Sequence, residues 1–281
     1  MISSTNNPIS NNVGLVNDLF CNKMLFFYLA LVKFLVIMDS TLKLFAKKII
    51  NVLVVAPLRF IIYSIKANKG IRDNTIHSVL WNDAIVDSAD YVKKYLPEAL
   101  LFDETNGLWD YAISKIQEFD PCDILEFGCY KATSINYFST KLPDSKFYGF
   151  DSFQGLPGDW FGHHAPKGAF DLKLNLPKVS KNVELIPGWF DETLPDFFKN
   201  NSDLNALFFH IDSDTYDSCC TVLLNVKNLL KPGVLVLFDE YLAYPNWENG
   251  EFLAWQEFCI QNSIKYRYLG FANEQALIKI I

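Results

Sequence analysis

Short apolar runs alternate with amphipathic stretches along much of the chain, and this pattern predicts its strands and helices. Seven strands are predicted, at 123–127, 146–150, 183–186, 206–211, 234–238, 265–269 and 276–280. Helices fit between them, as at 217–230, where a Lys-Pro-Gly sequence marks the helix end. Five near-continuous apolar strands, followed by two joined through a short loop, predict an α/β fold. Its doubly wound, seven-stranded sheet should be mostly parallel with an antiparallel edge strand.

The N-terminal part has a different pattern, which predicts a division into residues 1–75 and 76–281. Apolar stretches at 24–38 and 49–65 predict helices, but neither holds the run of about 20 apolar residues that a membrane span needs. Lys and Arg recur beside these stretches, as in helices that lie in a membrane interface. Two interpretations stay open. Residues 19–66 make peripheral membrane contact, or the helices pack on the rest of the protein or on a second subunit of a homo-oligomer.

Charge and cysteine usage narrow the function classes. Residues 1–75 carry nine Lys and Arg against three Asp, a net charge of +6. Since the whole chain has a net charge of −7, residues 76–281 have a net charge of −13. A strongly acidic globular part argues against a nucleic-acid partner, because phosphate contacts need basic residues. The six cysteines form no C-x-x-C pair and no zinc-like spacing. They predict buried thiols in a cytoplasmic protein, which would lie at the inner face of a membrane if its basic helices bind lipid.

The turn after the first predicted strand has the chemistry of a cofactor site. Glu126 and Gly128 follow an apolar run and precede a new helical pattern. A dinucleotide fingerprint would place glycines at positions 130 and 133, but Tyr130 and Thr133 stand there. A cofactor with an amino acid and a nucleoside but no phosphate, S-adenosylmethionine, therefore fits better than one with a pyrophosphate. The alternative is a purely structural glycine, since many strand-to-helix turns carry one.

Acidic and aromatic residues also end the later strands, where ligands bind in an open parallel sheet. Asp151 can accept hydrogen bonds from both ribose hydroxyls, and Trp189 can face an adenine ring. Asp212 and Asp239 end neighbouring strands about 4.8 Å apart and can reach one ion, with Glu240 or Asp214 adding another oxygen.

Such an all-oxygen set favours Mg²⁺ over zinc. The structural alternative is that these acids cap the helices that follow, which is as good an interpretation for Asp214 and Asp217.

Five motifs in order carry a resemblance to a known family. They begin with the turn Glu126-x-Gly128-x-Tyr130-Lys131-x-x-Ser134, and continue with the segments 151–157, 188–195, 212–218 and 238–241. From about residue 105 to 281 the chain resembles class I S-adenosylmethionine-dependent methyltransferases with a Rossmann-like fold, of the macrocin and mycinamicin sugar O-methyltransferase type. Ala132 stands where that family usually has Gly. Residues 1–75 lie outside the resemblance.

The resemblance implies a set of site residues. The cofactor-binding residues would be Glu126, Gly128, Tyr130, Lys131, Ser134, Asp151, Ser152 and Trp189. The magnesium ligands would be Asp212, Asp239 and Glu240. Many relatives have Asp where this chain has Glu240, so that side chain would reach the ion differently or through water.

The predicted reaction is O-methylation of a saccharide or another small-molecule acceptor. Asp212 and Asp239 would act in catalysis by holding Mg²⁺ and a vicinal diol, since a metal ion acidifies a bound hydroxyl. His163, in an insertion at 158–174 that could form a lid, is the candidate base; a surface or core role is the alternative. The aromatic series Trp247, Phe252, Trp255 and Phe258 is either an acceptor platform, with Trp247 in its loop as the main candidate, or, from the spacing of 252 to 258, a helix packed on the sheet. Two other functions stay open: a metal-independent methyltransferase acting on a lipid or quinone, and a non-catalytic, membrane-tethered binding module.

Overall fold

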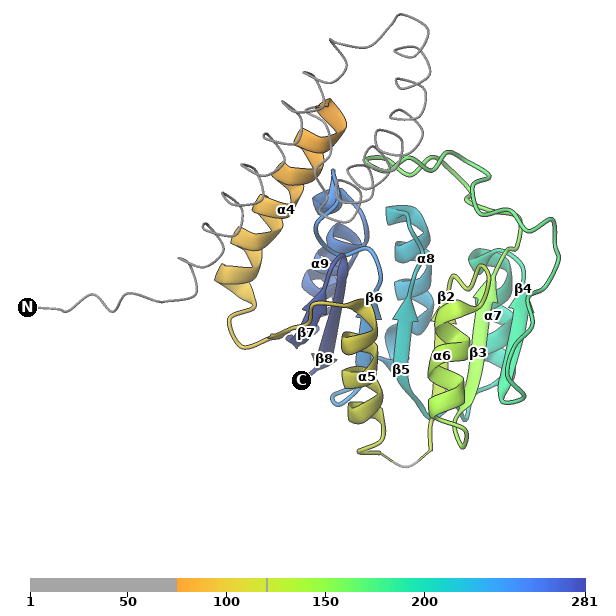
Figure 1. Cartoon of the computed structure of the whole chain (residues 1–281). Coiled ribbons are helices and arrows are strands. Elements are labelled where there is room, and N and C mark those ends of the chain that lie inside the picture. The colour runs from red at the N-terminus through yellow and green to blue at the C-terminus, as the bar shows by residue number, and fades with distance from the viewer. Residues whose placement is uncertain (1–74, 120) are drawn as a thin grey trace, which may run out of the picture. The chain divides into compact units, whose positions relative to one another are not determined.

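The computed structural model describes residues 75–119 and 121–281, which all fall in one compact unit, Asn74–Ile281 (Figure 1). The predicted boundary after residue 75 and the proposed membrane or subunit contacts of residues 19–66 concern residues outside the described ones, and they stay predictions. Within the described part, no helix is both long and apolar enough to cross a membrane.

Helices and strands alternate along the described chain. The helices are α4 (Ile76–Tyr95), α5 (Thr105–Ile116), α6 (Thr133–Lys141), α7 (Phe190–Asn200), α8 (Tyr216–Val226) and α9 (Glu251–Asn262), with short 3₁₀ helices η2 (Lys227–Leu229) and η3 (Trp247–Asn249). The strands are β1 (Leu100–Leu101), β2 (Asp123–Phe127), β3 (Lys146–Asp151), β4 (Val183–Pro187), β5 (Ala206–Ile211), β6 (Leu235–Phe238), β7 (Tyr266–Ala272) and β8 (Gln275–Ile280).

The sheet has the strand order β1-β7-β8-β6-β5-β2-β3-β4. Neighbouring strands pair in parallel except β8, which is antiparallel to both β6 and β7. The predicted doubly wound, mostly parallel α/β fold is confirmed. An eighth strand was not predicted, because β1 is only two residues long, and both of its residues are exposed.

Side chains that alternate between the two faces of the sheet divide the core into two layers. In β6, Leu235 and Leu237 pack with the cluster that includes α5 and α6, whereas Val236 and Phe238 pack with the cluster that includes α7, α8 and α9. Successive side chains of a strand point to opposite faces, so strands that are apolar at every position need helices on both faces. Figure 1 shows α5 and α6 in front of the sheet. This arrangement leaves the carboxyl edge of the parallel strands free for a site.

Candidate active site

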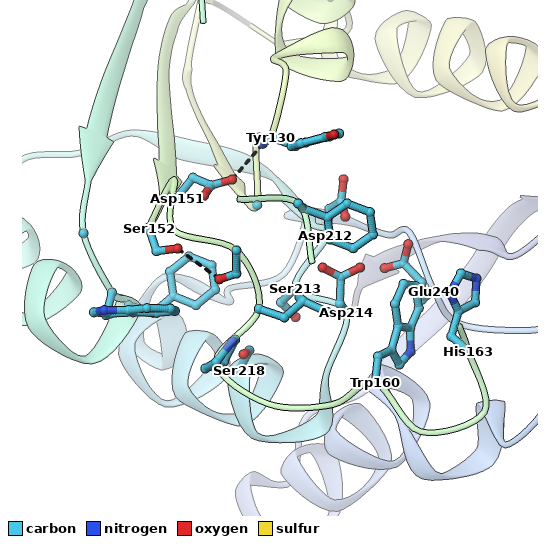
Figure 2. A pocket seen from close by; sticks show the side chains of 18 of the residues that line it. Tyr130, Asp151, Ser152, Trp160, His163, Asp212, Ser213, Asp214, Ser218 and Glu240 are labelled. Atoms are coloured by element: carbon cyan, nitrogen blue, oxygen red, sulfur yellow. Dashed lines mark hydrogen bonds between the residues drawn. The ribbon is translucent and has the colours of Figure 1, made fainter. Parts of the chain in front are cut away.

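A cavity of about 340 Å³ opens at the carboxyl edge of the parallel strands, a volume typical of small-molecule sites. The predicted site residues that line it are Gly128, Tyr130, Asp151, Ser152, His163, Trp189, Asp212 and Glu240. Figure 2 shows Asp151 and Ser152 at one end, Trp160, His163 and Glu240 at the other, and Asp212 and Asp214 between them. The pocket therefore has two chemically different ends.

The turn between β2 and α6 is shaped by close backbone contacts. Gly128 has φ +95°, and a Cβ atom there would meet the carbonyl oxygen of Asp212 at 1.7 Å. Only glycine fits, and the reason is the approach of the chain that follows β5 rather than the approach of a ligand. Ala132 has φ +60°, in the left-handed region that favours glycine, which explains why relatives place Gly at this position.

Asp151 builds the same turn from the end of β3. Its Oδ2 accepts hydrogen bonds from the backbone N–H groups of Cys129 at 2.9 Å and Tyr130 at 2.7 Å. Its Oδ1 accepts from the N–H of Phe153 at 2.6 Å. The carboxylate thus orients the turn while it lines the pocket, and most of its accepting capacity is used by the backbone. Trp189 lines the same end, directly before α7.

Glu126 and Ser134 lie beneath the pocket wall instead of lining it. Glu126 is buried, accepts a hydrogen bond from the Ser134 hydroxyl at 2.9 Å, and lies 2.9 Å from His210 Nδ1. Lys131 is also not among the lining residues; its Nζ lies 4.8 Å from the centre of the exposed Tyr130 ring. The structure does not bring these three side chains to the cavity, and direct contact with a cofactor stays a prediction for them.

His210 joins this buried pair to Asp239. Its Nε2 lies 3.3 Å from Asp239 Oδ1, which also accepts a hydrogen bond from Gln275. Burial alone would lower the pKa of His210, but the hydrogen bonds to Asp239 and Glu126 outweigh burial and raise it. A chain of hydrogen bonds therefore runs from Glu126, beside the turn between β2 and α6 that we call the cofactor-type turn, to the predicted metal ligand Asp239.

Four carboxylates meet at the ends of β5 and β6, and we call Asp212, Asp214, Asp239 and Glu240 the acidic cluster. Ligand atoms of Asp212, Asp214 and Glu240 lie within 4.8 Å of one another, and those of Asp212, Asp239 and His210 form a second such group. Burial, and then neighbouring carboxylates, raise the pKa values of Asp212, Asp214 and Glu240.

The acidic cluster has the features of a cation site. Glu240 Oε2 is buried and has no hydrogen-bond partner among the described residues. An uncompensated buried carboxylate oxygen beside other carboxylates is costly unless a cation neutralises it. Because the grouped pocket donors Asp212, Asp214 and Glu240 offer only oxygen, the residues present fit Mg²⁺ or another hard divalent ion.

The helix-capping alternative is wrong for Asp214. The N-cap of α8 is Thr215, whose side chain accepts from the Ser218 N–H. Asp214 instead lines the pocket and has φ +62°, an uncommon conformation for a residue other than glycine. Strained backbone of this kind often occurs at functional sites.

Glu251 and Glu274 belong to the site, but sequence reasoning gave neither of them a role in it. Glu251 is fully buried and accepts hydrogen bonds from the Ser213 N–H at 2.9 Å, the Ser213 hydroxyl at 2.7 Å and the Glu240 N–H at 3.3 Å. Glu274 lines the pocket, where burial and then Asp239 raise its pKa to about 7. Neither residue ends a predicted parallel strand, so no local signal marked them.

The insertion predicted as a lid does close one end of the pocket. Trp160 and His163 line the cavity, whereas Phe161 is 76% exposed. Burial, then His164 and His77, lower the pKa of His163. The imidazole is therefore neutral near neutral pH.

The acceptor-platform interpretation of Trp247 is wrong. Its side chain is 3% exposed and packs against Tyr91 and Phe252 in the core. Helix α9 likewise buries Trp255 and Phe258, which confirms the packing interpretation for this aromatic series.

Comparison with known proteins supports what the geometry indicates. Residues 125–241 match a family model described as a methyltransferase domain. This segment is similar to methyltransferase domains. It contains the cofactor-type turn, Asp151, Trp189 and the acidic cluster, so the match covers most of the pocket.

Two curated proteins show the same relationship. The mycinamicin III 3''-O-methyltransferase of Micromonospora griseorubida is 26% identical over 161 residues, which are 48% of this chain and 61% of that protein. The 8-demethyl-8-(2,3-dimethoxy-α-L-rhamnosyl)-tetracenomycin-C 4'-O-methyltransferase of Streptomyces olivaceus is 26% identical over 143 residues, 43% of this chain and 53% of that protein. The matched segment thus spans less than two thirds of either relative.

Among solved structures, the chain is similar to CalS11, a calicheamicin methyltransferase. The TM-score is 0.51 with 23% identity, covering 61% of this chain and 76% of that one. At this level of identity the likeness supports the fold. Together with the family match, it confirms the resemblance drawn from the motifs.

Proposed function

We propose that this protein transfers the methyl group of S-adenosylmethionine to a hydroxyl of a saccharide acceptor, with the help of a bound Mg²⁺. The observation that carries the proposal is the two-ended pocket, which has a cofactor-type turn at one end and the acidic cluster at the other. The sugar O-methyltransferases named above support the choice of reaction and acceptor class.

The lining residues fit a cationic methyl donor. Among the residues that the structure describes, the pocket is lined by five carboxylates and by no Lys or Arg. A pyrophosphate-bearing cofactor would be repelled there, whereas a sulfonium with an ammonium group would be attracted. Asp151 and Trp189 lie at the donor end, where a ribose hydroxyl and an adenine ring would find an acceptor oxygen and an aromatic face.

Asp212, Asp239 and Glu240 are the ligands that we propose for Mg²⁺, which when bound would lower the pKa of an acceptor hydroxyl. Support for Asp239 comes from its surroundings, because His210 and Gln275 hold its Oδ1. Hydrogen bonds of this kind orient metal ligands in many sites. The orphaned Oε2 of Glu240 supports the role of that residue.

Asp214 is the residue that we propose as the acceptor of the hydroxyl proton. It lines the pocket beside Asp212 and Glu240, and its pKa is raised by burial and by neighbouring carboxylates. A carboxylate with a raised pKa is a better base than a free one. Methyl transfer itself then needs alignment of donor and acceptor, for which the walls of the pocket serve.

The test is turnover with labelled S-adenosylmethionine and a panel of glycosides. Asp239→Ala should abolish turnover while cofactor affinity stays within a few fold. Asp214→Asn should lower kcat while Mg²⁺ affinity is kept. A fully active Asp239→Ala variant would refute the metal site, and Mg²⁺ affinity lost in Asp214→Asn would make Asp214 a ligand rather than the base.

Two alternative functions would each give a different experimental result. Turnover that is unchanged in EDTA would indicate a metal-independent methyltransferase. No heat of S-adenosylmethionine binding in isothermal titration would indicate a non-catalytic binding module.

A further inference from the structure

The lid forms a well-packed aromatic wall at the end of the pocket opposite the cofactor-type turn. The Trp160 ring, 7% exposed, stacks on His163 with 4.0 Å between ring centres and 16° between ring planes. Gly162, with φ +87°, fits against Pro245, whose carbonyl oxygen would lie 1.8 Å from an added Cβ. This packing holds the lid residues in a defined position without a ligand.

Three polar atoms at this wall are buried without a hydrogen-bond partner among the described residues: Trp160 Nε1 and, beside it, the pair His163 Nδ1 and Glu240 Oε2. Figure 2 shows the two side chains on the same side of the cavity, with Trp160 beside them. Buried polar atoms are nearly always satisfied in native proteins, so an unsatisfied pair at a pocket wall calls for a ligand. The groups of close possible metal ligands among the described residues do not include His163, so a cation at the acidic cluster would satisfy Glu240 Oε2 and leave His163 Nδ1 without a partner.

The charge of the wall limits what that ligand can be. Glu240 lies at this end, Asp214 and Glu274 also line the pocket, and none of the described lining residues is Lys or Arg. A phosphate or carboxylate on the part of the acceptor inside the pocket would meet only like charge. Hydroxyl groups, by contrast, can donate to carboxylates and can both donate to and accept from a neutral imidazole.

We infer that Trp160 and His163 form the acceptor subsite, and that it binds an uncharged glycosyl residue with His163 Nδ1 hydrogen-bonded to one of its hydroxyls. The inference rests on the proposed function. It makes His163 a substrate-binding residue rather than the base, and it places any phosphate of the acceptor outside the pocket.

The experiment measures binding of a panel of methyl glycosides to the full chain saturated with Mg²⁺ and S-adenosylhomocysteine, by saturation-transfer NMR. The tightest glycoside is then compared with its sugar 1-phosphate and with catechol, which is an aromatic vicinal diol. We expect the neutral glycoside to bind more tightly than either. Tighter binding of the phosphate or of catechol, or no binding of any glycoside, would overturn the inference.

Three variants test the role of His163. His163→Phe keeps an aromatic ring but removes the polar atom, and it should weaken glycoside binding about five- to tenfold, the effect of one lost hydrogen bond. His163→Asn places a polar atom near the position of Nδ1 and should restore most of the affinity. His164→Phe is the matched control, because His164 is exposed and does not line the pocket.

The kinetic signature separates binding from base catalysis. His163→Phe should raise the acceptor KM with kcat changed less than about threefold, and His163→Asn should restore KM. Glycoside affinity that is equal in wild type and His163→Phe would overturn the inference, as would a loss confined to kcat. If wild type binds no S-adenosylmethionine at all, the proposed function fails instead, and titration of that cofactor distinguishes the two failures.

Discussion

Binding of Mg²⁺ to the acidic cluster should stabilise the fold, and Asp212→Asn should remove this response. Without a cation, two ionised carboxylates within 4.8 Å of each other repel by at least about 3.5 kcal/mol at an effective dielectric constant of about 20. Asp212 belongs to both groups of close ligand atoms, so the amide relieves more repulsion than a change at any other member. The metal-free variant should therefore be at least as stable as the metal-free wild type.

The size of the Mg²⁺ effect follows from linkage. A ligand at 100 times its dissociation constant stabilises the folded state by about 2.7 kcal/mol. For a unit of the size of Asn74–Ile281, 1 kcal/mol shifts Tm by about 2–4 °C. Saturating Mg²⁺ should then raise the Tm of the wild type by about 5–11 °C, and that of Asp212→Asn by less than about 1 °C.

The assay is differential scanning calorimetry of wild type and variants in EDTA and across a Mg²⁺ titration. Asp217→Asn is the matched control, because Asp217 lies close by in sequence but is exposed in the first turn of α8. It should keep the full Mg²⁺ response. A wild type that shows no shift, or an Asp212→Asn variant that shifts as much as wild type, would refute the assignment of the cluster as a cation site.

Three further predictions concern the same region. Gly128→Ala should prevent stable folding or lower Tm by more than 10 °C, since the new Cβ would meet the Asp212 carbonyl oxygen at 1.7 Å and φ is +95°. Thermal unfolding of the variant near the wild-type Tm would contradict this. His210→Phe leaves Glu126 and Asp239 buried without their shared partner, so urea denaturation should show a free energy of unfolding lower by about 3–5 kcal/mol. A decrease under 1 kcal/mol would show that the hydrogen bonds of His210 are dispensable. The Mg²⁺-dependent Tm shift should shrink as pH falls from about 8 to about 5.5, because the raised pKa values of the cluster's carboxyl groups let protons compete with the ion. The metal-free protein should gain stability over the same fall in pH, because its folded state binds more protons than the unfolded chain. A Tm shift that does not depend on pH would contradict this.

The parallel strands and the position of the site were predictable because they depend on local patterns. Apolar runs bounded by turn residues predicted the parallel strands, and parallel strands bring their carboxyl ends to one edge of a sheet. The acids at the ends of β3, β5 and β6 therefore had to gather there. The two-residue strand β1 lies below the length at which such a pattern can be recognised.

Contacts between distant residues were decided only by the tertiary structure. Glu126 and Gly128 are two residues apart, yet one is buried against His210 and the other lines the cavity, because successive parts of a turn face different neighbours. Glu251 reaches the backbone of Ser213, 38 positions away, through the packing of α9.

The stacked pair of Trp160 and His163 likewise depends on the fit of Gly162 against Pro245, in a loop far along the chain. The sequence by itself thus determined the fold class and the edge of the sheet where chemistry occurs. The packing of helices and loops, which depends on side-chain volumes across the whole unit rather than on local periodicity, decided which of those residues share a pocket.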